Sequence, residues 1–277
     1  MGELSRQEAC LRMTVTRDEV DTISGELWQL GTLGIEEVDA GTTVTLLAGF
    51  NSAISADDAA KQLKRFAVVE EFGSGDYLDA WRDFASIYRA GNRLVVKPPW
   101  VRYEPNASEL VLWIDPGRSF GSGSHPSTRL ALAQLEQLLE GNESVLDVGC
   151  GSGVLTVAAA RLGATRVVGV DIDPAAPQVT LGNAKANGVE EFVEASTTSL
   201  PDLTDRYSVI VANMLASTLI ESAAQFVRRL RPGGRLIISG ILEPQVDSVA
   251  NALQPLTLLT TRSGDAEEGL WVCLTLG

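Results

Sequence analysis

The sequence predicts an α/β protein with a small leading α+β domain and a larger domain built on a mostly parallel sheet of seven strands. Three observations predict this fold. From about residue 126 onward, apolar strand-like runs alternate with helical segments, as in parallel sheets covered by helices on both faces. The last two strands, at 256–261 and 270–276, are joined by a polar loop alone and therefore form a hairpin. Before residue 73 the order is instead strand, helix, two strands, helix, strand.

The leading domain is expected to cover residues 1–75. The order of its strands and helices is typical of a ferredoxin-like domain, in which two helices cover one face of a four-stranded sheet. Ser55 is the expected N-cap of its second helix. Its elements follow from the spacing of apolar residues, with strands at 11–16, 35–38, 43–47 and 67–72 and helices at 18–30 and 57–66.

A connector is expected over residues 76–117, after Gly73-Ser74-Gly75. It holds a short helix around Trp81 and Phe84 and two strands, at 93–97 and 109–114. The larger domain then covers residues 118–277. Its elements before the hairpin are helix 127–139, strand 144–148, helix 154–162, strand 166–170, helix 174–187, strand 208–212, a helix ending at Leu230, and strand 235–239. A hairpin that closes such a sheet is expected of class I methyltransferases, a Rossmann-like class, and not of the NAD-binding fold.

Composition and charge exclude several classes of protein. The 277 residues suit two domains, and a hydrophobic fraction of 45% is ample for buried cores. No apolar run approaches the roughly 18 residues of a membrane-spanning helix, and residues 1–12 carry mixed charges rather than an apolar signal segment. Three widely separated cysteines show no metal-binding spacing, so a cytoplasmic protein without a bound metal is expected. The net charge of −14 argues against direct nucleic-acid binding and favours a basic partner, although solubility alone also accounts for it.

A glycine-rich turn, Gly149-Cys150-Gly151-Ser152-Gly153, follows the strand at 144–148 and precedes a helix. Glycine lets a ligand approach the backbone where a Cβ would collide, so Gly149 and Gly151 are candidate cofactor contacts; the alternative is an ordinary tight connection. Asp171 ends the next strand and can accept hydrogen bonds from both hydroxyls of a ribose. Because NAD and S-adenosyl-L-methionine both contain a ribose, this feature does not separate them.

Asn213 follows the strand at 208–212 and therefore stands at the carboxyl edge of the sheet, where sites in open α/β sheets form. Its carbonyl can accept a hydrogen bond from an amine and orient that amine toward a methyl group. A dehydrogenase has no use for such a residue. The alternative is that Asn213 caps the following helix, because asparagine is a favoured N-cap.

Residues 115–128 read Asp-Pro-Gly-Arg-Ser-Phe-Gly-Ser-Gly-Ser-His-Pro-Ser-Thr. This segment resembles the signature Asp-Pro-Gly-x-x-Phe-Gly-Thr-Gly-x-His-x-Thr-Thr of the PrmA family, whose members methylate the eleventh protein of the large ribosomal subunit. The resemblance continues through residues 147–153, 169–174, 211–215 and 236–242, and so spans roughly residues 76–277. Three serines, Ser122, Ser124 and Ser127, stand where the family has threonines, and residues 1–75 match only in outline.

The resemblance implies a cofactor, S-adenosyl-L-methionine, and a set of residues that bind it. Thr128, Gly149 and Asp171 match the family's cofactor contacts, and Asn213 matches the asparagine after the fourth strand. The signature loop covers the cofactor in the family, which implies that Phe120 and His125 lie near the pocket. His125 is then either a general base or a loop residue that shapes this cover.

The predicted function is methyl transfer from S-adenosylmethionine to lysine ε-amines or the N-terminal α-amine of a basic ribosomal protein, with Asn213 as the catalytic residue that orients the amine. Residues 1–75 are expected to recognise the acceptor, and no membrane partner is expected. The alternatives are a PrmA-like enzyme with another protein or small-molecule acceptor, a NAD-dependent oxidoreductase, and a binding protein that has lost catalysis.

Overall fold

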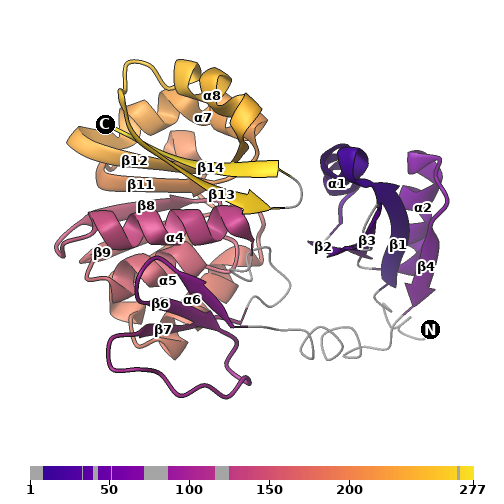
Figure 1. Ribbon diagram of the computed structural model, residues 1–277, viewed down its shortest axis with the longest axis horizontal. Helices are drawn as coiled ribbons and strands as arrows, with labels where there is room; N and C mark the ends of the chain where they lie inside the picture. Colours follow the sequence, from indigo (N-terminus) through magenta and orange to yellow (C-terminus); the bar gives the residue numbers. More distant parts are fainter. Residues whose placement is uncertain are drawn as a thin grey trace. The chain divides into compact units, whose positions relative to one another are not determined.

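The computed structural model describes residues 9–32, 34–39, 43–50, 52–71, 87–115, 125–266 and 269–277. The chain divides into two compact units, residues 1–85 and 86–277, and each is described by itself (Figure 1). The strands expected at 93–97 and 109–114 belong to the second unit. The helix expected around Trp81 and Phe84 lies outside the described residues.

The first unit has the element order βαββαβ that the sequence predicts. Its antiparallel sheet has the strand order β2-β3-β1-β4. The elements are β1 (Ala9–Thr16), the short 3-10 helix η1 (Arg17–Glu19), α1 (Val20–Gln29), β2 (Gly34–Asp39), β3 (Thr43–Phe50), α2 (Ala53–Leu63) and β4 (Val68–Glu71).

Alternation along β1 and β3 builds the core of this unit. Leu11, Met13 and Val15 are buried while the residues between them are exposed, and β3 buries every second residue in the same way. Both helices turn apolar side chains onto this face, including Ile23 of α1 and Ala59 of α2. The two helices therefore cover the same face of the sheet.

The expected N-cap of α2 was wrong by three residues. Ser52 is the N-cap: its backbone is extended, and its hydroxyl oxygen accepts a hydrogen bond from the Ser55 amide at 3.2 Å. Ser55 occupies the third helical position and bonds back to Ser52, which completes a capping box. The helix also ends earlier than expected, because Lys64 adopts a left-handed conformation (φ 51°) and leaves Phe66 exposed.

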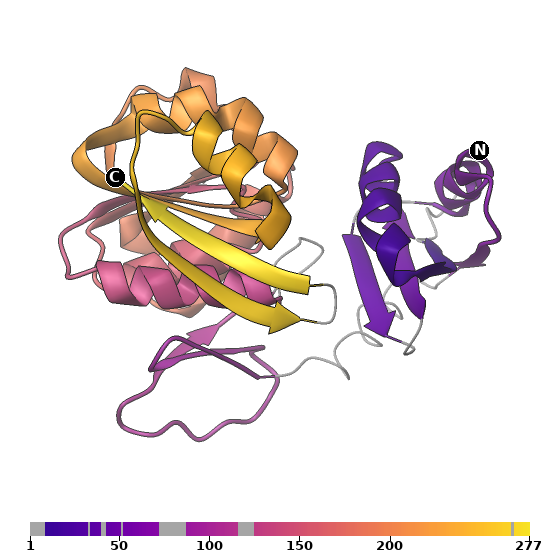
Figure 2. The ribbon, with the colours of Figure 1, turned by 45° about the horizontal axis from the view of Figure 1, so that its top comes forward.

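The second unit is built on a seven-stranded sheet with the order β10-β9-β8-β11-β12-β14-β13. The first five strands are parallel, and β14 enters antiparallel between β12 and β13, so the predicted closing hairpin is confirmed (Figure 2). The strands are β8 (Ser144–Val148), β9 (Arg166–Val170), β10 (Val193–Ser196), β11 (Tyr207–Asn213), β12 (Leu230–Leu242), β13 (Leu258–Ala266) and β14 (Gly269–Leu276).

Helices cover both faces of this sheet. The α-helices are α4 (Pro126–Leu138), α5 (Val154–Arg161), α6 (Ala176–Ala186), α7 (Ala216–Arg229) and α8 (Val246–Ala252), and 3-10 turns lie at η2 (Glu190–Phe192), η3 (Leu200–Asp202) and η4 (Glu243–Gln245). Figure 1 shows α4, α5 and α6 on one side of the sheet and α7 and α8 on the other. Neighbouring strand residues accordingly enter different cores: Val145 packs with α4 and α5, whereas Leu146 packs with α7 and α8.

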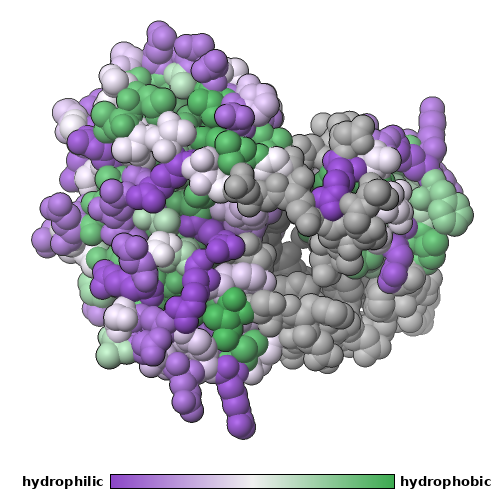
Figure 3. Space-filling view, in the orientation of Figure 1, coloured by the Kyte–Doolittle hydropathy of each residue, from purple (hydrophilic) through white to green (hydrophobic). Residues whose placement is uncertain are grey.

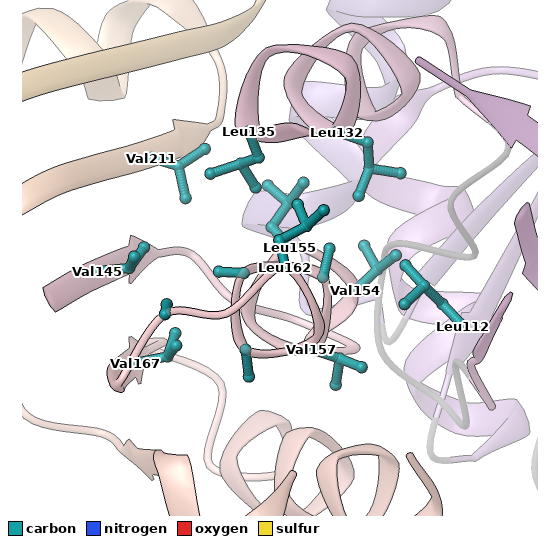
Figure 4. Packing of buried hydrophobic residues seen from close by; sticks show 14 of the residues in the cluster. Leu112, Leu132, Leu135, Val145, Val154, Leu155, Val157, Leu162, Val167 and Val211 are labelled. Carbon is teal, nitrogen blue, oxygen red and sulfur yellow. The ribbon is translucent and has the colours of Figure 1, made fainter. Parts of the chain in front are cut away.

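A smaller sheet completes the first of these cores. It consists of β5 (Tyr88–Ala90), β6 (Leu94–Lys97) and β7 (Leu110–Trp113). Figure 4 shows Leu112 of this sheet beside Val154 and Val157 of α5, and Leu135 of α4 facing Val211 of β11. The carboxyl end of β7 is thus held against α5, next to the glycine-rich turn.

Besides the short 3-10 turns, two strands and one α-helix of this unit were missing from the sequence-based expectation: β5, β10 and α8. The six strands located from the sequence omitted β10, which buries only Val193 of its four residues. Within the described ranges, no helix has both the length and the apolar character needed to cross a membrane. Hydrophilic side chains alternate with smaller apolar patches on the face of the second unit in Figure 3.

Candidate active site

The glycine-rich turn folds around the end of β9. The amides of Gly149 and Cys150 both donate to the carbonyl of Val170, at 2.8 and 3.1 Å. The Gly151 amide donates to Oδ2 of Asp171 at 2.8 Å, and Gly153 donates to the Cys150 carbonyl at 2.7 Å. Four amides of the turn are therefore used inside the protein and do not form a free cradle for a pyrophosphate.

Glycine is required in this turn for two different reasons. Gly149, Gly151 and Gly153 all have positive φ, between 50° and 78°, which side chains rarely adopt. At Gly153 a Cβ would also come within 2.9 Å of the backbone of Thr180 on α6. The constraint at Gly153 is therefore the packing of a helix, and not the approach of a ligand as the glycine pattern alone suggests.

Asp171 lies one residue beyond β9 and is half-buried. Its Oδ2 accepts from Gly151, and its Oδ1 accepts from the amide of Asp173 at 2.9 Å. Each carboxylate oxygen retains a second lone pair, so both can still accept a hydroxyl of a ribose. The neighbouring Ile172 is 98% exposed, which places an uncovered apolar side chain beside this carboxylate.

Asn213 is the last residue of β11, and its side chain meets α4. Its Nδ2 donates to the hydroxyl oxygen of the buried Thr128 at 3.0 Å, joining two residues that are 85 positions apart in the sequence. Among the described residues no hydrogen-bond donor contacts its Oδ1. The N-cap of α7 is Leu215, so Asn213 is not a cap of that helix.

Close backbone packing holds this asparagine in place. A Cβ on Gly240 of β12 would lie 2.9 Å from Oδ1 of Asn213 and 2.6 Å from the Met214 carbonyl, so only glycine fits here. Ser239 donates to the Ser127 carbonyl at 2.9 Å and thereby fastens the first turn of α4 to β12. A Cβ on Gly149 would lie 3.0 Å from Sδ of Met214, so the side chain next to Asn213 in the sequence lies over the glycine-rich turn.

His125 is the N-cap of α4. Its Nδ1 accepts from the Ser127 amide at 3.3 Å and lies 2.7 Å from the Ser127 hydroxyl, and its ring packs edge-on against Trp271 at 4.5 Å. One ring nitrogen is therefore engaged in ordering the helix terminus. Phe120 and the rest of the signature from residue 116 to 124 lie outside the described residues.

A second carboxylate, Asp147, is completely buried in β8 beneath the turn. The Thr156 hydroxyl donates to its Oδ2 at 2.6 Å, and its Oδ1 has no partner within the described part of the chain. Burial, reinforced by the charge of Asp171, raises the pKa of Asp147 to about 7. Burial of Asp147 therefore disfavours a negative charge on the carboxyl group that lies beneath the turn.

Sequence reasoning missed Asn183 of α6, whose side chain donates to the Ser152 carbonyl inside the turn at 2.8 Å. The available signal was a pair of asparagines four residues apart, Asn183 and Asn187, on one face of an otherwise ordinary helix.

The order of the strands now defines a class. The sheet is parallel up to β12, and the antiparallel β14 lies between β12 and β13. The amides of the glycine-rich turn donate to groups of the protein itself. The NAD-binding fold differs at both points. The second unit is a class I methyltransferase.

Comparison with known proteins gives the family. The profile described as "Ribosomal protein L11 methyltransferase (PrmA)" matches residues 9–277. Proteins of that name from Pelotomaculum thermopropionicum and Geobacter metallireducens are 40% and 37% identical to this chain, over 99% and 89% of it and over 84% and 86% of their own lengths. The crystal structure of a ribosomal protein L11 methylase from Lactobacillus delbrueckii subsp. bulgaricus is 30% identical, with a TM-score of 0.62 over 69% of this chain and 96% of that one.

The chain belongs to the ribosomal protein L11 methyltransferase family. It is a protein methyltransferase that depends on S-adenosylmethionine, as the sequence predicts. The oxidoreductase alternative is thereby excluded.

Proposed function

We propose that this enzyme transfers methyl groups from S-adenosylmethionine to amino groups of ribosomal protein L11, on lysine side chains or at the N-terminus. The proposal rests on the candidate cofactor residues, which lie at one edge of the sheet: Thr128, Asn213, Gly149, Gly151 and Asp171. The match to the family from residue 9 to residue 277 supports it.

The residues present fit this cofactor, which contains a ribose and two positive charges but no phosphate. Asp171 would accept the ribose hydroxyls and Ile172 would offer an apolar surface to the adenine ring. The backbone of Gly149 and Gly151 would lie against the amino-acid part, and Thr128 would support it from α4. Phe120 and His125 are proposed to lie near the same pocket.

The bound cofactor supplies an activated methyl group on a sulfonium ion. Asn213 would accept a hydrogen bond from the incoming amine through Oδ1, since its Nδ2 is engaged with Thr128. The amine must lose its proton before attack, and water can take that proton. Orientation of the two reactants can contribute roughly 7–11 kcal/mol when the alignment is good.

The first unit is proposed to recognise the acceptor, because the candidate cofactor residues all lie in the second unit. Its sequence is acidic around residues 36–39, 57–58 and 70–71. A basic ribosomal protein would be attracted by that charge, and its binding would weaken as salt rises. All three cysteines are free and buried, which suits the cytoplasm, where we place this reaction.

The test is mass spectrometry of purified L11 after incubation with the enzyme and S-adenosylmethionine, with a fragment of residues 86–277 in parallel. Full-length enzyme should add methyl groups to L11, whereas the fragment should bind S-adenosylmethionine with nearly unchanged affinity and leave L11 unmodified. If the full-length enzyme does not modify L11, the acceptor is a different one. If the fragment modifies L11 at the full-length rate, the first unit does not select the substrate.

A further inference from the structure

Two buried asparagines, Asn183 in α6 and Asn187 at its C-cap, lie one helical turn apart and are 4% and 7% exposed. Each binds both backbone polar groups of a single residue at the end of β7. Asn187 accepts from the Trp113 amide at 2.9 Å and donates to the Trp113 carbonyl at 2.7 Å. Asn183 does the same with Asp115, at 2.9 and 2.7 Å. The side-chain amides thus replace the partner strand that β7 lacks on this side.

The two residues differ in where their second N–H points. Nδ2 of Asn187 also donates to the Asn183 carbonyl, within its own helix, at 2.8 Å. Nδ2 of Asn183 instead donates to the Ser152 carbonyl at 2.8 Å. Asn183 therefore joins three segments that are distant in sequence: α6, residue 115 and the glycine-rich turn. Among the described residues, the side chain of Asn187 joins only the end of α6 and β7.

The carbonyl of Ser152 lies in the middle of the turn, between amides of Gly151 and Gly153 that are themselves hydrogen-bonded inside the protein. Glycines at 149, 151 and 153 give the unfolded chain many conformations, and each must be confined to one positive φ. The Gly151 amide, one residue before Ser152, is the group that orients the Asp171 carboxylate. A hydrogen bond to the Ser152 carbonyl therefore restrains the turn and, through Gly151, the carboxylate.

We infer that Asn183 is a positioning residue for the cofactor, which holds the glycine-rich turn and residue 115 in the arrangement that S-adenosylmethionine binds. It does so without touching the cofactor itself. This inference rests on the proposed cofactor role of the turn and of Asp171. Residue 115 opens the signature segment, so the same side chain fixes the start of that segment to the turn.

Asn187 provides a matched control, because it is the same residue type one turn further along, is similarly buried, and pairs in the same way with both backbone groups of a single residue. The experiment compares Asn183→Ala with Asn187→Ala in the full-length enzyme, measuring the melting temperature without cofactor and the affinity for S-adenosylmethionine by calorimetry. Both variants should melt at similarly lowered temperatures. Asn183→Ala should bind S-adenosylmethionine about tenfold more weakly, and Asn187→Ala should bind it nearly as the wild type does.

Should the alanine variants fail to fold, Asn183→Asp and Asn187→Asp give the same comparison with almost no change in volume. An aspartate at 183 keeps the acceptor for the Asp115 amide but turns an oxygen toward two carbonyls.

Equal affinities for the two variants of a pair would overturn the inference, because Asn183 would then only stabilise the fold. Asp171→Ala, titrated in the same series, separates this failure from failure of the site. If Asp171→Ala weakens binding and Asn183→Ala does not, the proposed cofactor site is supported and the positioning role of Asn183 is overturned. If neither weakens binding, the cofactor lies elsewhere and both are overturned.

Discussion

At the amino ends of the parallel strands polar side chains join neighbouring strands to one another, whereas at the carboxyl ends several of them hold irregular backbone. Arg166, at the start of β9, pairs with Glu194 at 2.8 Å and with Asp205 at 2.7 Å. Ser144 and Ser208, at the starts of β8 and β11, exchange hydrogen bonds. Each of these groups therefore has a partner on a neighbouring strand or loop.

The carboxyl ends use carboxylates and amides to shape irregular backbone. Asp171 binds the amides of Gly151 and Asp173, and Asn183 binds the Ser152 carbonyl. A pocket near the opposite end of the sheet is lined by Arg166, Glu194 and Asp205 among others, and there Arg166 is already paired with both carboxylates. The difference favours the carboxyl edge as the candidate site, because acceptors with spare lone pairs lie there beside the glycine-rich turn.

The largest effect is expected at Asp171. Asp171→Ala should weaken S-adenosylmethionine binding by roughly ten- to a thousandfold, or about 1.4–4 kcal/mol for two ribose hydrogen bonds left unmade. The control variant is Arg166→Ala, at the amino end of the same strand. It removes ion pairs that are partly exposed and should leave the affinity for S-adenosylmethionine unchanged. Calorimetry on both variants decides the comparison. Equal losses in the two variants would mean that the two edges do not differ as proposed.

A smaller effect, confined to turnover, is expected at Asn213. Asn213→Ala should lower kcat about a hundredfold while changing cofactor affinity much less, because its proposed partner is the amine. Ser208→Ala, at the other end of the same strand, should leave kcat near the wild-type value. Steady-state kinetics with L11 test this pair. Full turnover by the Asn213 variant would leave that residue a purely structural link to Thr128.

The smallest effect is expected on stability, from substitution of Asp147, which lies inside β8 between the amino and carboxyl edges of the sheet. Its pKa is raised to about 7 by burial, whereas a carboxyl in the unfolded chain titrates near 4. The folded chain therefore binds more protons between about pH 4 and 7, so this group's contribution to stability falls as pH rises through that window. Asp147→Asn should gain a few degrees in melting temperature relative to the wild type between pH 5 and pH 8.

The measurement is a melting curve for both proteins at several pH values, with Asp202→Asn as a control for an exposed carboxylate. A difference in melting temperature that stays constant with pH would show that Asp147 titrates normally and lies in a wetter site than the fold indicates.

The sequence predicts the site best where one residue stands at a strand end. Asp171 and Asn213 each follow a run of buried apolar residues, so their place at the sheet edge follows from a local pattern. Thr128 was inferred through the family resemblance, since nothing near it in the sequence indicates the contact with Asn213. Asn183 was not identified from the sequence for the same reason, because its hydrogen-bond partners lie 68 and 31 residues away.

The fold was missed in places where the local pattern is short or symmetric. Strand β10 has four residues at a sheet edge, and only Val193 is buried, so no alternation can establish itself. Ser52 and Ser55 each satisfy the pattern of a cap because a capping box is reciprocal, and the extended backbone at Ser52 decides between them.

The division of the second unit into two cores has a consequence for engineering. Leu135 of α4 and Phe226 of α7 are both fully buried, but they belong to different clusters separated by the sheet. Free-energy changes add when sites share no partners, so stabilising substitutions can be screened on each face independently and then combined. The stability of each core can therefore be improved separately, provided that the strand ends around Asp171 and Asn213 are left unchanged.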